Sequence, residues 1–365
     1  MDVHLVKESA TGRYRFHDLI RQYARMRTNL PEPARRDAVR RLLNQYVHQV
    51  RLANSYLNPD ARETPADLKP PCPVPDIGDA DGAILWCETE LPNLIAAIRH
   101  ASEAGWRHQG SQLVTALPWF FRRRGHTSVW IDCSRIGIDM AADDTERANI
   151  LRELGNAYYT AARYNDSRDV LTGALALYRR TGDLWGEGAT LNNIGNTHLW
   201  TDQLIDAVDC YQQALAVRQR SGDLRGSGLT LNNLSHVYRW LNQHPESLDA
   251  GLQALDAFHR SADRRGEGMA YNNIAMLYLE MGRPTEAVVH GRQALAVARE
   301  VRDRLSESAA LDTLGAIHRD LGDYQTAIDH HHRALTIARE IGHTTIAAEI
   351  QENLRQTIRA AEAER

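Results

Sequence analysis

The chain has 365 residues and a formal net charge of −4 with a pI near 6.5, so it lacks the strongly basic balance of most nucleic-acid-binding domains. No apolar run reaches the ~18 residues of a membrane-spanning helix, and the first residues do not have the pattern of a signal peptide. Four cysteines are scattered without a C-x-x-C pair, which predicts free thiols in a reducing cytoplasm; they are Cys72, Cys87, Cys133 and Cys210.

Residues 1–57 contain the run RYRFHDLIRQYA at positions 13–24. This run resembles the end of the winged-helix domain in NB-ARC ATPases, whose signature M-H-D corresponds here to Phe16, His17 and Asp18. In that family the histidine approaches a nucleotide phosphate, so the resemblance marks His17 and Asp18 as a nucleotide-sensing remnant. The P-loop pattern G-x-x-x-x-G-K-[ST] has no match in the chain, and we therefore expect no nucleotide at these residues. We expect a winged-helix remnant and a helix over 1–57.

The next two segments differ in composition. Residues 58–82 have no helical period and are rich in proline, which favours a linker; the prolines are Pro59, Pro65, Pro70, Pro71, Pro73 and Pro75. Residues 83–144 contain an amphipathic pair of helices, predicted at 88–104 and 106–124 around Gly105, and a further helix at 128–141. We expect 83–144 to form an irregular helical leader to the segment that follows.

Residues 145–350 repeat with a period of 40. Asparagine recurs at positions 193, 233 and 273, and an Ala-Leu pair begins at 174, 214, 254, 294 and 334. A fixed period of this size indicates stacked helix–turn–helix units, because one such unit cannot bury its apolar face alone. We therefore predict an all-α superhelix of five 40-residue units over 145–350, closed by a capping helix at 351–365.

Small residues recur at fixed places in each unit. The alanine column that begins at Ala174 predicts a tight contact with no room for a larger side chain. Glycines recur early in the first helix of units two to four, and we expect them to let two backbones approach closely; they are Gly186, Gly226, Gly266, Gly188, Gly228 and Gly268. At the unit junctions, as in Gly182-Asp183, the glycine is expected to end one helix and the aspartate to cap the next.

This repeat pattern resembles the tetratricopeptide repeat. The resemblance rests on Asn193-Ile194-Gly195 with Asn196, then Ala207, then Ala214-Leu215. The period exceeds the usual length of about 34 residues and is similar to the long-repeat subclass of peptide-sensing and cargo-binding proteins. Upstream, residues 83–94 (AILWCETELPNL) resemble the segment that joins NB-ARC to the repeats in AfsR-like actinobacterial regulators of antibiotic production. The resemblance as a whole implies the C-terminal region of an AfsR-like NB-ARC (STAND) regulator.

Paired asparagines are the sharpest candidate for function. In the family that the chain resembles, the first helix of each unit lines a concave groove, which places Asn193, Asn233 and Asn273 on or beside that face. An asparagine offers both a donor and an acceptor, so a ladder of them matches the backbone of an extended peptide. Neighbouring helical positions point about 100° apart, and the alternative is that one asparagine of each pair braces neighbouring helices. The candidate groove residues are Asn156, Asn192, Asn193, Asn196, Asn232, Asn233, His236, Arg239, Trp240, Asn272, Asn273 and Arg319.

Metal binding and catalysis have little support in the sequence. His330, His331 and His332 are consecutive on a predicted helix and face three directions, so they cannot chelate one ion. His290 and His330 share a column on adjacent units and could pair. No Ser/His/Asp or Cys/His set can be placed, and we expect no metal, no cofactor and no catalysis within this chain.

We predict that the chain recognises a protein or peptide in the concave groove. By resemblance, the setting is a cytoplasmic regulator of transcription or secondary metabolism, with no membrane contact and no direct nucleic-acid binding by this chain. Two alternatives stay open. One is a free-standing scaffold that holds two proteins together. The other is an enzyme or enzyme partner of a biosynthetic cluster, with a small-molecule pocket near Trp106, Trp119 and Trp130.

Overall fold

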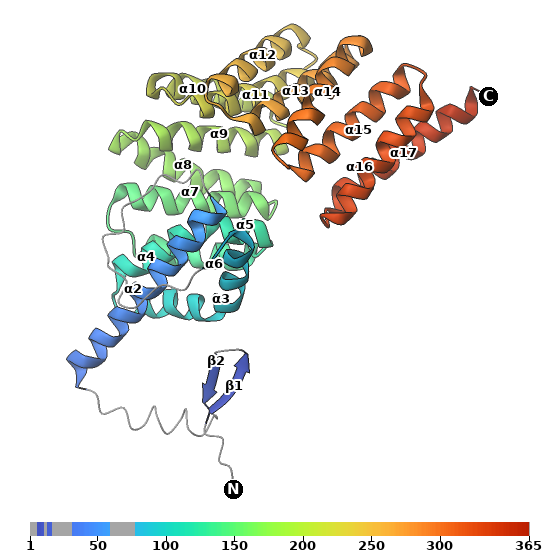
Figure 1. The fold of residues 1–365 in the computed structure, drawn as a ribbon. Helices are drawn as coiled ribbons and strands as arrows, with labels where there is room; N and C mark the ends of the chain where they lie inside the picture. Colours follow the sequence, from blue (N-terminus) through green and yellow to red (C-terminus); the bar gives the residue numbers. More distant parts are fainter. Residues whose placement is uncertain (1–5, 11–12, 17–30, 59–76, 365) are drawn as a thin grey trace. The chain divides into compact units, whose positions relative to one another are not determined.

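The computed structural model describes residues 6–10, 13–16, 31–58 and 77–364 (Figure 1). The nucleotide-sensing remnant His17–Asp18 and the proline-rich stretch 59–76 lie outside the described residues. The chain forms two compact units, Met1–Phe120 and Phe121–Arg365. The boundary between them falls inside the segment 83–144, for which the sequence predicts one continuous leader. No described helix combines the length and the apolar character needed to cross a membrane.

The first unit contains a short hairpin and three long or medium helices. Strand β1 (Val6–Ala10) pairs antiparallel with β2 (Arg13–Phe16), with Val6 opposite Phe16. The all-α prediction omits this hairpin, although the alternation of charged and aromatic residues in RYRF has the period of a strand. Helices α2 (Glu32–Leu57), α3 (Ala80–Glu103) and α4 (Arg107–Ala116) contact one another and bury apolar side chains such as Leu43, Leu94 and Leu113.

Proline divides the helix that the sequence predicts at 106–124. Helix α4 ends at Ala116, and α5 (Pro118–Arg124) begins with Pro118. Proline has no N–H to continue the helical hydrogen bonds, so it stands at the start of a helix instead. The further helix predicted at 128–141 is α6 (Thr127–Ile138).

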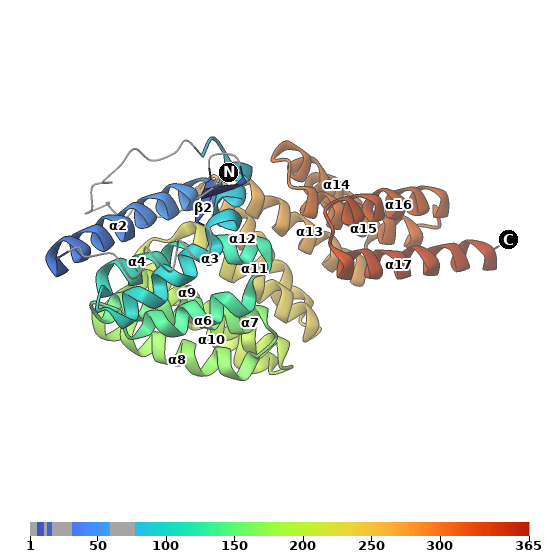
Figure 2. The same ribbon diagram turned by 90° about the horizontal axis from the view of Figure 1, so that it is seen from below.

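Five helix pairs and one closing helix make up most of the second unit, which confirms the predicted array. The pairs are α7 (Asp144–Thr160) with α8 (Tyr164–Thr181), α9 (Leu184–Trp200) with α10 (Leu204–Ser221), α11 (Leu224–Trp240) with α12 (His244–Arg260), α13 (Arg264–Glu280) with α14 (Pro284–Glu300), and α15 (Arg304–Asp320) with α16 (Tyr324–Glu340). Helix α17 (Thr344–Ala363) packs on α15 and α16 and closes the array (Figure 2).

The helices of the array form two layers. Each first helix contacts the first helix of the next unit, along the series α7, α9, α11, α13, α15 and α17. Each second helix packs against the first helix of its own unit and against the first helix of the next. The first helices therefore share a continuous face, called the first-helix face below.

Turns between the helices follow the predicted chemistry. Gly182 ends α8 in the left-handed conformation with φ 73°, and the Asp183 side chain caps α9 by accepting from the Gly186 N–H at 3.0 Å. Gly182 lies between two units. Within a unit, the turn from the first helix to the second also contains a left-handed residue, which is Asp202 in the second unit, Gly282 in the fourth and Gly322 in the fifth. Glycine adopts the left-handed conformation without steric strain, and the aspartate side chain accepts a hydrogen bond from the first turn of the next helix.

The alanine column is fully packed, as predicted, because Ala174, Ala214, Ala254 and Ala334 have no exposed surface and Ala294 has 2%. For the recurring glycines the prediction of close backbone approach holds in part: a Cβ at Gly188 would lie 3.6 Å from the Ala214 carbonyl oxygen and one at Gly268 3.9 Å from that of Ala294, whereas the others face side chains. A Cβ at Gly186 would lie 2.2 Å from the Tyr178 ring, and one at Gly266 would lie 2.3 Å from the Phe258 ring. Gly186 and Gly266 leave space for a ring from the preceding second helix, and Gly188 and Gly228 leave space for a large side chain from the second helix of their own unit.

Candidate functional site

Both asparagine columns lie in the middle of the first helices and differ in exposure. Asn192 and Asn232, in the first column, are buried with 8% and 5% of their surface exposed. Asn193, Asn233 and Asn273, in the second column, are partly exposed on the first-helix face. The difference follows from the angle of about 100° between neighbouring helical positions.

Hydrogen bonds join the two columns into a ladder along the first-helix face. The Nδ2 of Asn233 donates to Oδ1 of Asn192 at 3.2 Å and to Oδ1 of Asn196 at 3.3 Å, both in the preceding unit. The Nδ2 of Asn273 donates to Oδ1 of Asn232 at 2.9 Å. These bonds are the contact expected if one asparagine of each pair braces neighbouring helices, because Asn233 and Asn273 each bond to the preceding unit.

The ladder begins in the first unit of the array. The Nδ2 of Asn193 donates to Oδ1 of Asn156 at 2.7 Å, so three successive unit junctions carry an amide–amide bond. In this arrangement the second-column asparagines act as donors through Nδ2, Asn193 and Asn273 to one acceptor and Asn233 to two. No hydrogen bond to Oδ1 of Asn193, Asn233 or Asn273 is made by any part of the chain that the structure describes. These three carbonyls remain available to a ligand.

Thr313 interrupts the ladder between the fourth and fifth units. It occupies the second-column position of α15 and has no amide to donate. As a result, Oδ1 of Asn272 is buried without a hydrogen-bond partner among the described residues. The ladder resumes at the closing helix, where Asn353 Nδ2 donates to Asp312 Oδ2 at 2.8 Å.

Partners that support the ladder come from positions that the sequence did not single out. The Tyr211 hydroxyl donates to Asn196 Oδ1 at 2.7 Å, and the Thr230 hydroxyl donates to Asn192 Oδ1 at 3.2 Å. Burial raises the pKa of the Tyr211 phenol, so this group stays protonated and remains a donor. The signal in the sequence for this hydrogen bond to Asn196 is the phenol of Tyr211, which lies on the apolar face of its helix about one turn before the alanine column.

An aromatic and charged group lies at the end of α11. The rings of His236 and Trp240 are 4.6 Å apart between centroids, and Trp240 is 43% exposed. Burial, together with the positive charge of Arg239, lowers the pKa of His236 to about 4, so the imidazole is neutral at pH 7. Arg239 is itself buried and forms an ion pair with Glu280 of the next unit.

Other predicted site residues lie apart from this group. Arg319 is near Asp320, with 3.7 Å between Nε and Oδ1, in the fifth unit. The predicted pairing of His290 with His330 is wrong: His290 stacks on Tyr278 with ring centroids 5.3 Å apart, and His330 lies against His318. Rings on neighbouring first helices are closer to each histidine than the histidine one unit away.

The consecutive histidines do not converge. His331 is fully buried, and its Nδ1 lies 2.7 Å from Asp312 Oδ1, while His330 lies beside His318. In the segments that the structure covers, no three or more His, Cys, Asp or Glu side chains are grouped as they would be around a metal ion.

Comparison with known proteins supports the repeat assignment. The sequence matches the tetratricopeptide repeat family over residues 146–220, 186–260, 227–300 and 266–340, which together exceed half of the chain. It is also 33% identical over 122 residues to the regulatory protein AfsR of Streptomyces griseus. That match covers 32% of this chain and 12% of the relative, so the chain spans only a small part of the relative's length.

Solved structures share the fold at low sequence identity. One is a signal transduction ATPase with numerous domains (STAND) that carries a tetratricopeptide repeat sensor, PH0952 from Pyrococcus horikoshii, with 14% identity and a TM-score of 0.58 over 97% of this chain and 53% of that one. Another is a Rap protein complexed with competence and sporulation factor, with 13% identity and a TM-score of 0.53 over 90% and 99%. BtubC from P. vanneervenii has 18% identity and a TM-score of 0.51 over 61% and 92%.

Proposed function

The chain belongs to the tetratricopeptide-repeat family, and from this premise we propose that its first-helix face binds an extended peptide or protein segment. Tetratricopeptide repeats are protein-interaction modules rather than catalytic domains. The match to AfsR supports a regulatory setting, and the setting that we propose is a cytoplasmic regulator of transcription or secondary-metabolite production. Binding of a ligand along the first-helix face would control the activity of such a regulator.

The observation that carries this proposal is the row of three open asparagine carbonyls. Asn193, Asn233 and Asn273 stand one unit apart, are partly exposed, and donate an amide hydrogen to the preceding unit. That bond fixes the rotation of the amide, so each Oδ1 is held in place before a ligand arrives. Preorganised acceptors lose less entropy on binding, and backbone N–H groups of an extended chain are the complementary donors.

Exposed tryptophans support the same face. Trp200 and Trp240 occupy equivalent positions at the ends of α9 and α11 and are 58% and 43% exposed. Exposed aromatic rings in a row provide apolar contact area for side chains of a ligand, and aromatic residues are enriched at protein interfaces. The peptide would thus meet polar contacts at mid-helix and apolar contacts at the helix ends.

The test compares two double variants that both break the bonds Asn233–Asn192 and Asn273–Asn232; the bond from Asn233 to Asn196 is lost only in the first. Asn233→Ala with Asn273→Ala removes both donors and two open carbonyls, whereas Asn192→Ala with Asn232→Ala removes the acceptors and leaves the open carbonyls in place. Peptides selected from a displayed random library against the unmodified chain serve as the ligand. We expect the first variant to bind them about 10- to 100-fold more weakly, because neutral hydrogen bonds contribute ~0.5–1.5 kcal/mol each.

The second variant controls for loss of bracing. It should lose a similar free energy of unfolding, measured in urea, and retain affinity within about threefold, which is less than one neutral hydrogen bond. Equal loss of affinity in both variants would assign the asparagines to bracing alone. Unchanged affinity in both would place the peptide away from the ladder.

A further inference from the structure

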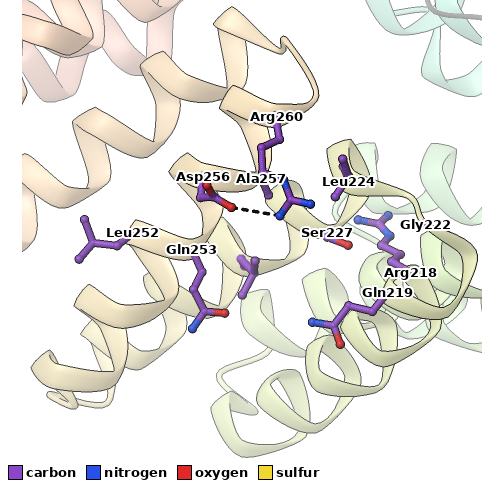
Figure 3. A pocket seen from close by; sticks show the side chains of 11 residues that line it. Arg218, Gln219, Gly222, Leu224, Ser227, Leu252, Gln253, Asp256, Ala257 and Arg260 are labelled. Carbon is purple, nitrogen blue, oxygen red and sulfur yellow. Dashed lines mark hydrogen bonds and ion pairs between the residues drawn. The ribbon is translucent and has the colours of Figure 1, made fainter.

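A pocket with a volume of about 500 Å³ opens between the end of α10, the start of α11 and α12 (Figure 3). None of its lining residues belongs to the asparagine ladder. Its apolar wall includes Leu224, Leu231 and Leu252. Its polar lining consists of Arg218, Gln219, Ser227, Gln253, Asp256 and Arg260.

Arg218 occupies a position that other units fill with an aromatic or small side chain. The equivalent residues are Tyr178, Phe258, Ala298 and Ala338. A Cβ at Gly188 would lie 2.8 Å from the Arg218 side chain, just as one at Gly228 would lie 2.8 Å from the Phe258 ring. The arginine therefore lies in a space that the repeat provides for a ring.

The Arg218 guanidinium is buried with few partners. The residue is 5% exposed, and its Nη1 donates to the Gly226 carbonyl and, at 2.8 Å, to Thr230 Oγ1. Its Nε has no hydrogen-bond partner among the described residues, and the carboxylate of Asp223 is 3.9 Å away. Burial of a charge without a close counter-ion is unfavourable, so an anion that reached this group would gain a strong interaction.

A glutamate that lies beside a basic side chain at the start of the first helix in other units is absent from this pocket. The ion pair Arg179–Glu187, at 2.9 Å, recurs as Arg299–Glu307, and His259 Nδ1 lies 3.3 Å from Glu267 Oε1 at the equivalent place. At the junction of the second and third units the corresponding residues are the neutral Gln219 and Ser227.

A second ion pair is also replaced at the pocket. The fourth and fifth units join Arg264 to Glu300 and Arg304 to Glu340, each at 2.6 Å. The third unit has Leu224 and Arg260 at these positions, and Arg260 pairs with Asp256 at 3.3 Å. Around this pocket Ser227 thus stands where Glu187, Glu267 and Glu307 stand elsewhere, and Arg260 stands where the last two units have glutamate and the first two have arginine.

We propose that this pocket binds the anionic head group, carboxylate or phosphate, of a small molecule whose apolar part lies against the three leucines. Arg218 and Arg260 supply two guanidinium groups, and Asp256 offsets one of them. Guanidinium groups bind carboxylate and phosphate through paired charge-assisted hydrogen bonds. The head group would occupy the place that a glutamate carboxylate takes in the neighbouring units.

The test uses three probes that share an eight-carbon chain. Octanoate carries a carboxylate, octyl phosphate carries a phosphate, and octan-1-ol carries no charge; each is titrated into the full chain by calorimetry. We expect at least one anionic probe to bind ten or more times more tightly than octan-1-ol. The stronger anion identifies the head group. Binding of octan-1-ol as tight as that of the anions, or no binding of either anion at millimolar concentration, overturns the proposal.

Two variants that copy residues of neighbouring units separate binding from folding. Arg218→Phe places in the glycine-lined space the ring that Phe258 places one unit later, and Ser227→Glu restores the carboxylate found at Glu187, Glu267 and Glu307. Both should melt at or above the temperature of the parent chain, because both residues already fit this repeat. Both should bind the anionic probe at least ten times more weakly, since one lacks the buried cation and the other supplies its own anion.

The matched control is Arg220→Gln, which changes the counterpart of Arg260 in the preceding unit and does not line the pocket. It should leave the affinity for the anionic probe unchanged. If Arg218→Phe and Ser227→Glu fold and bind the probe as well as the parent, the anion binds elsewhere and the proposal is wrong.

Discussion

Adjacent asparagines in this array have different hydrogen-bonding roles, because one uses its amide oxygen and the other its amide nitrogen. The buried first-column residue accepts through Oδ1 from the following unit, and the second-column residue donates to the preceding unit. Only a side chain with both a donor and an acceptor can satisfy such a ladder and still offer a carbonyl to a ligand. The sequence predicts the pair from its period, but the bonds join residues 37 or 41 positions apart, which only the stacking geometry reveals.

Restoring the interrupted step of the ladder should stabilise the array. Thr313→Asn supplies an amide beside the buried Oδ1 of Asn272, which lacks a hydrogen-bond partner within the described residues. We expect a gain of about 0.5–1.5 kcal/mol in the free energy of unfolding, the usual net value of one such bond. Urea unfolding of Thr313→Asn and of Thr313→Ala measures it, and a variant no more stable than Thr313→Ala would show that the amide cannot reach Asn272.

His236 should make stability depend on pH. Its pKa is lowered to about 4 by burial and by Arg239, whereas the unfolded chain has the ordinary value near 6.5. The unfolded state therefore binds more protons between these values, so the contribution is complete above about pH 6.5 and is lost as the pH falls towards 4. His236→Phe, which keeps a ring against Trp240, should reduce the loss of stability between pH 7 and pH 5 by about 1–2 kcal/mol. An identical pH profile in urea unfolding would contradict this assignment.

At the scale of helices, periodicity and turn residues predict most of the array, and local interruptions account for the differences. The five pairs and the closing helix follow from the 40-residue period. At the junctions the left-handed residue is glycine at 182, 222 and 342, but Ala262 and Arg302 adopt the same conformation at the other two. The break at Pro118 depends on one residue outside the period, and the pairing of β1 with β2 involves a segment that has no such period. The glycine rows predict close backbone contacts, and the sequence does not show that large side chains such as Tyr178 and Phe258 fill the space above several of them.

Enlarging the alanine column should weaken packing within a helix pair. Ala254 has no exposed surface and packs in a cluster with Leu231 and Phe258. Ala254→Leu should cost ~1–3 kcal/mol through overpacking, measured by urea unfolding. Ala216→Leu, at an exposed position of α10, is the control and should change stability by less than ~0.5 kcal/mol. Equal stability of the two variants would show that the column tolerates larger side chains.

Across the whole array, apolar and polar contacts between units are distributed differently. One buried cluster extends from Ala275 and Ala294 through Leu314 to Leu354, across the last two units and the closing helix. Earlier units have smaller separate clusters, and the asparagine ladder lies across their junctions. In an array stabilised by neighbour contacts, the ladder should therefore matter most where the apolar cluster does not extend.

Hydrogen exchange can test whether the asparagine ladder stabilises the first units and the apolar cluster the last ones. In the variant Asn233→Ala with Asn273→Ala, amides of α9, α11 and α13 should exchange faster by about fivefold or more, as the loss of one or two weak bonds implies. Amides of α15, α16 and α17 should keep their protection, because their apolar cluster is unchanged. Uniform acceleration along all five units would indicate that the array unfolds as one cooperative body.

One side chain, that of Thr230, connects the pocket residue Arg218 to the ladder residue Asn192. Arg218 donates to Thr230, Thr230 donates to Asn192, and Asn192 accepts from Asn233. If an anion at Arg218 and a peptide at Asn233 each bias this chain of bonds, the two affinities are coupled, and the coupling is the same in both directions. A tenfold effect of the anion on the peptide would correspond to about 1.4 kcal/mol, and the peptide would strengthen anion binding by the same factor. With a favourable coupling, the repeat array would bind each ligand most tightly when the other is present.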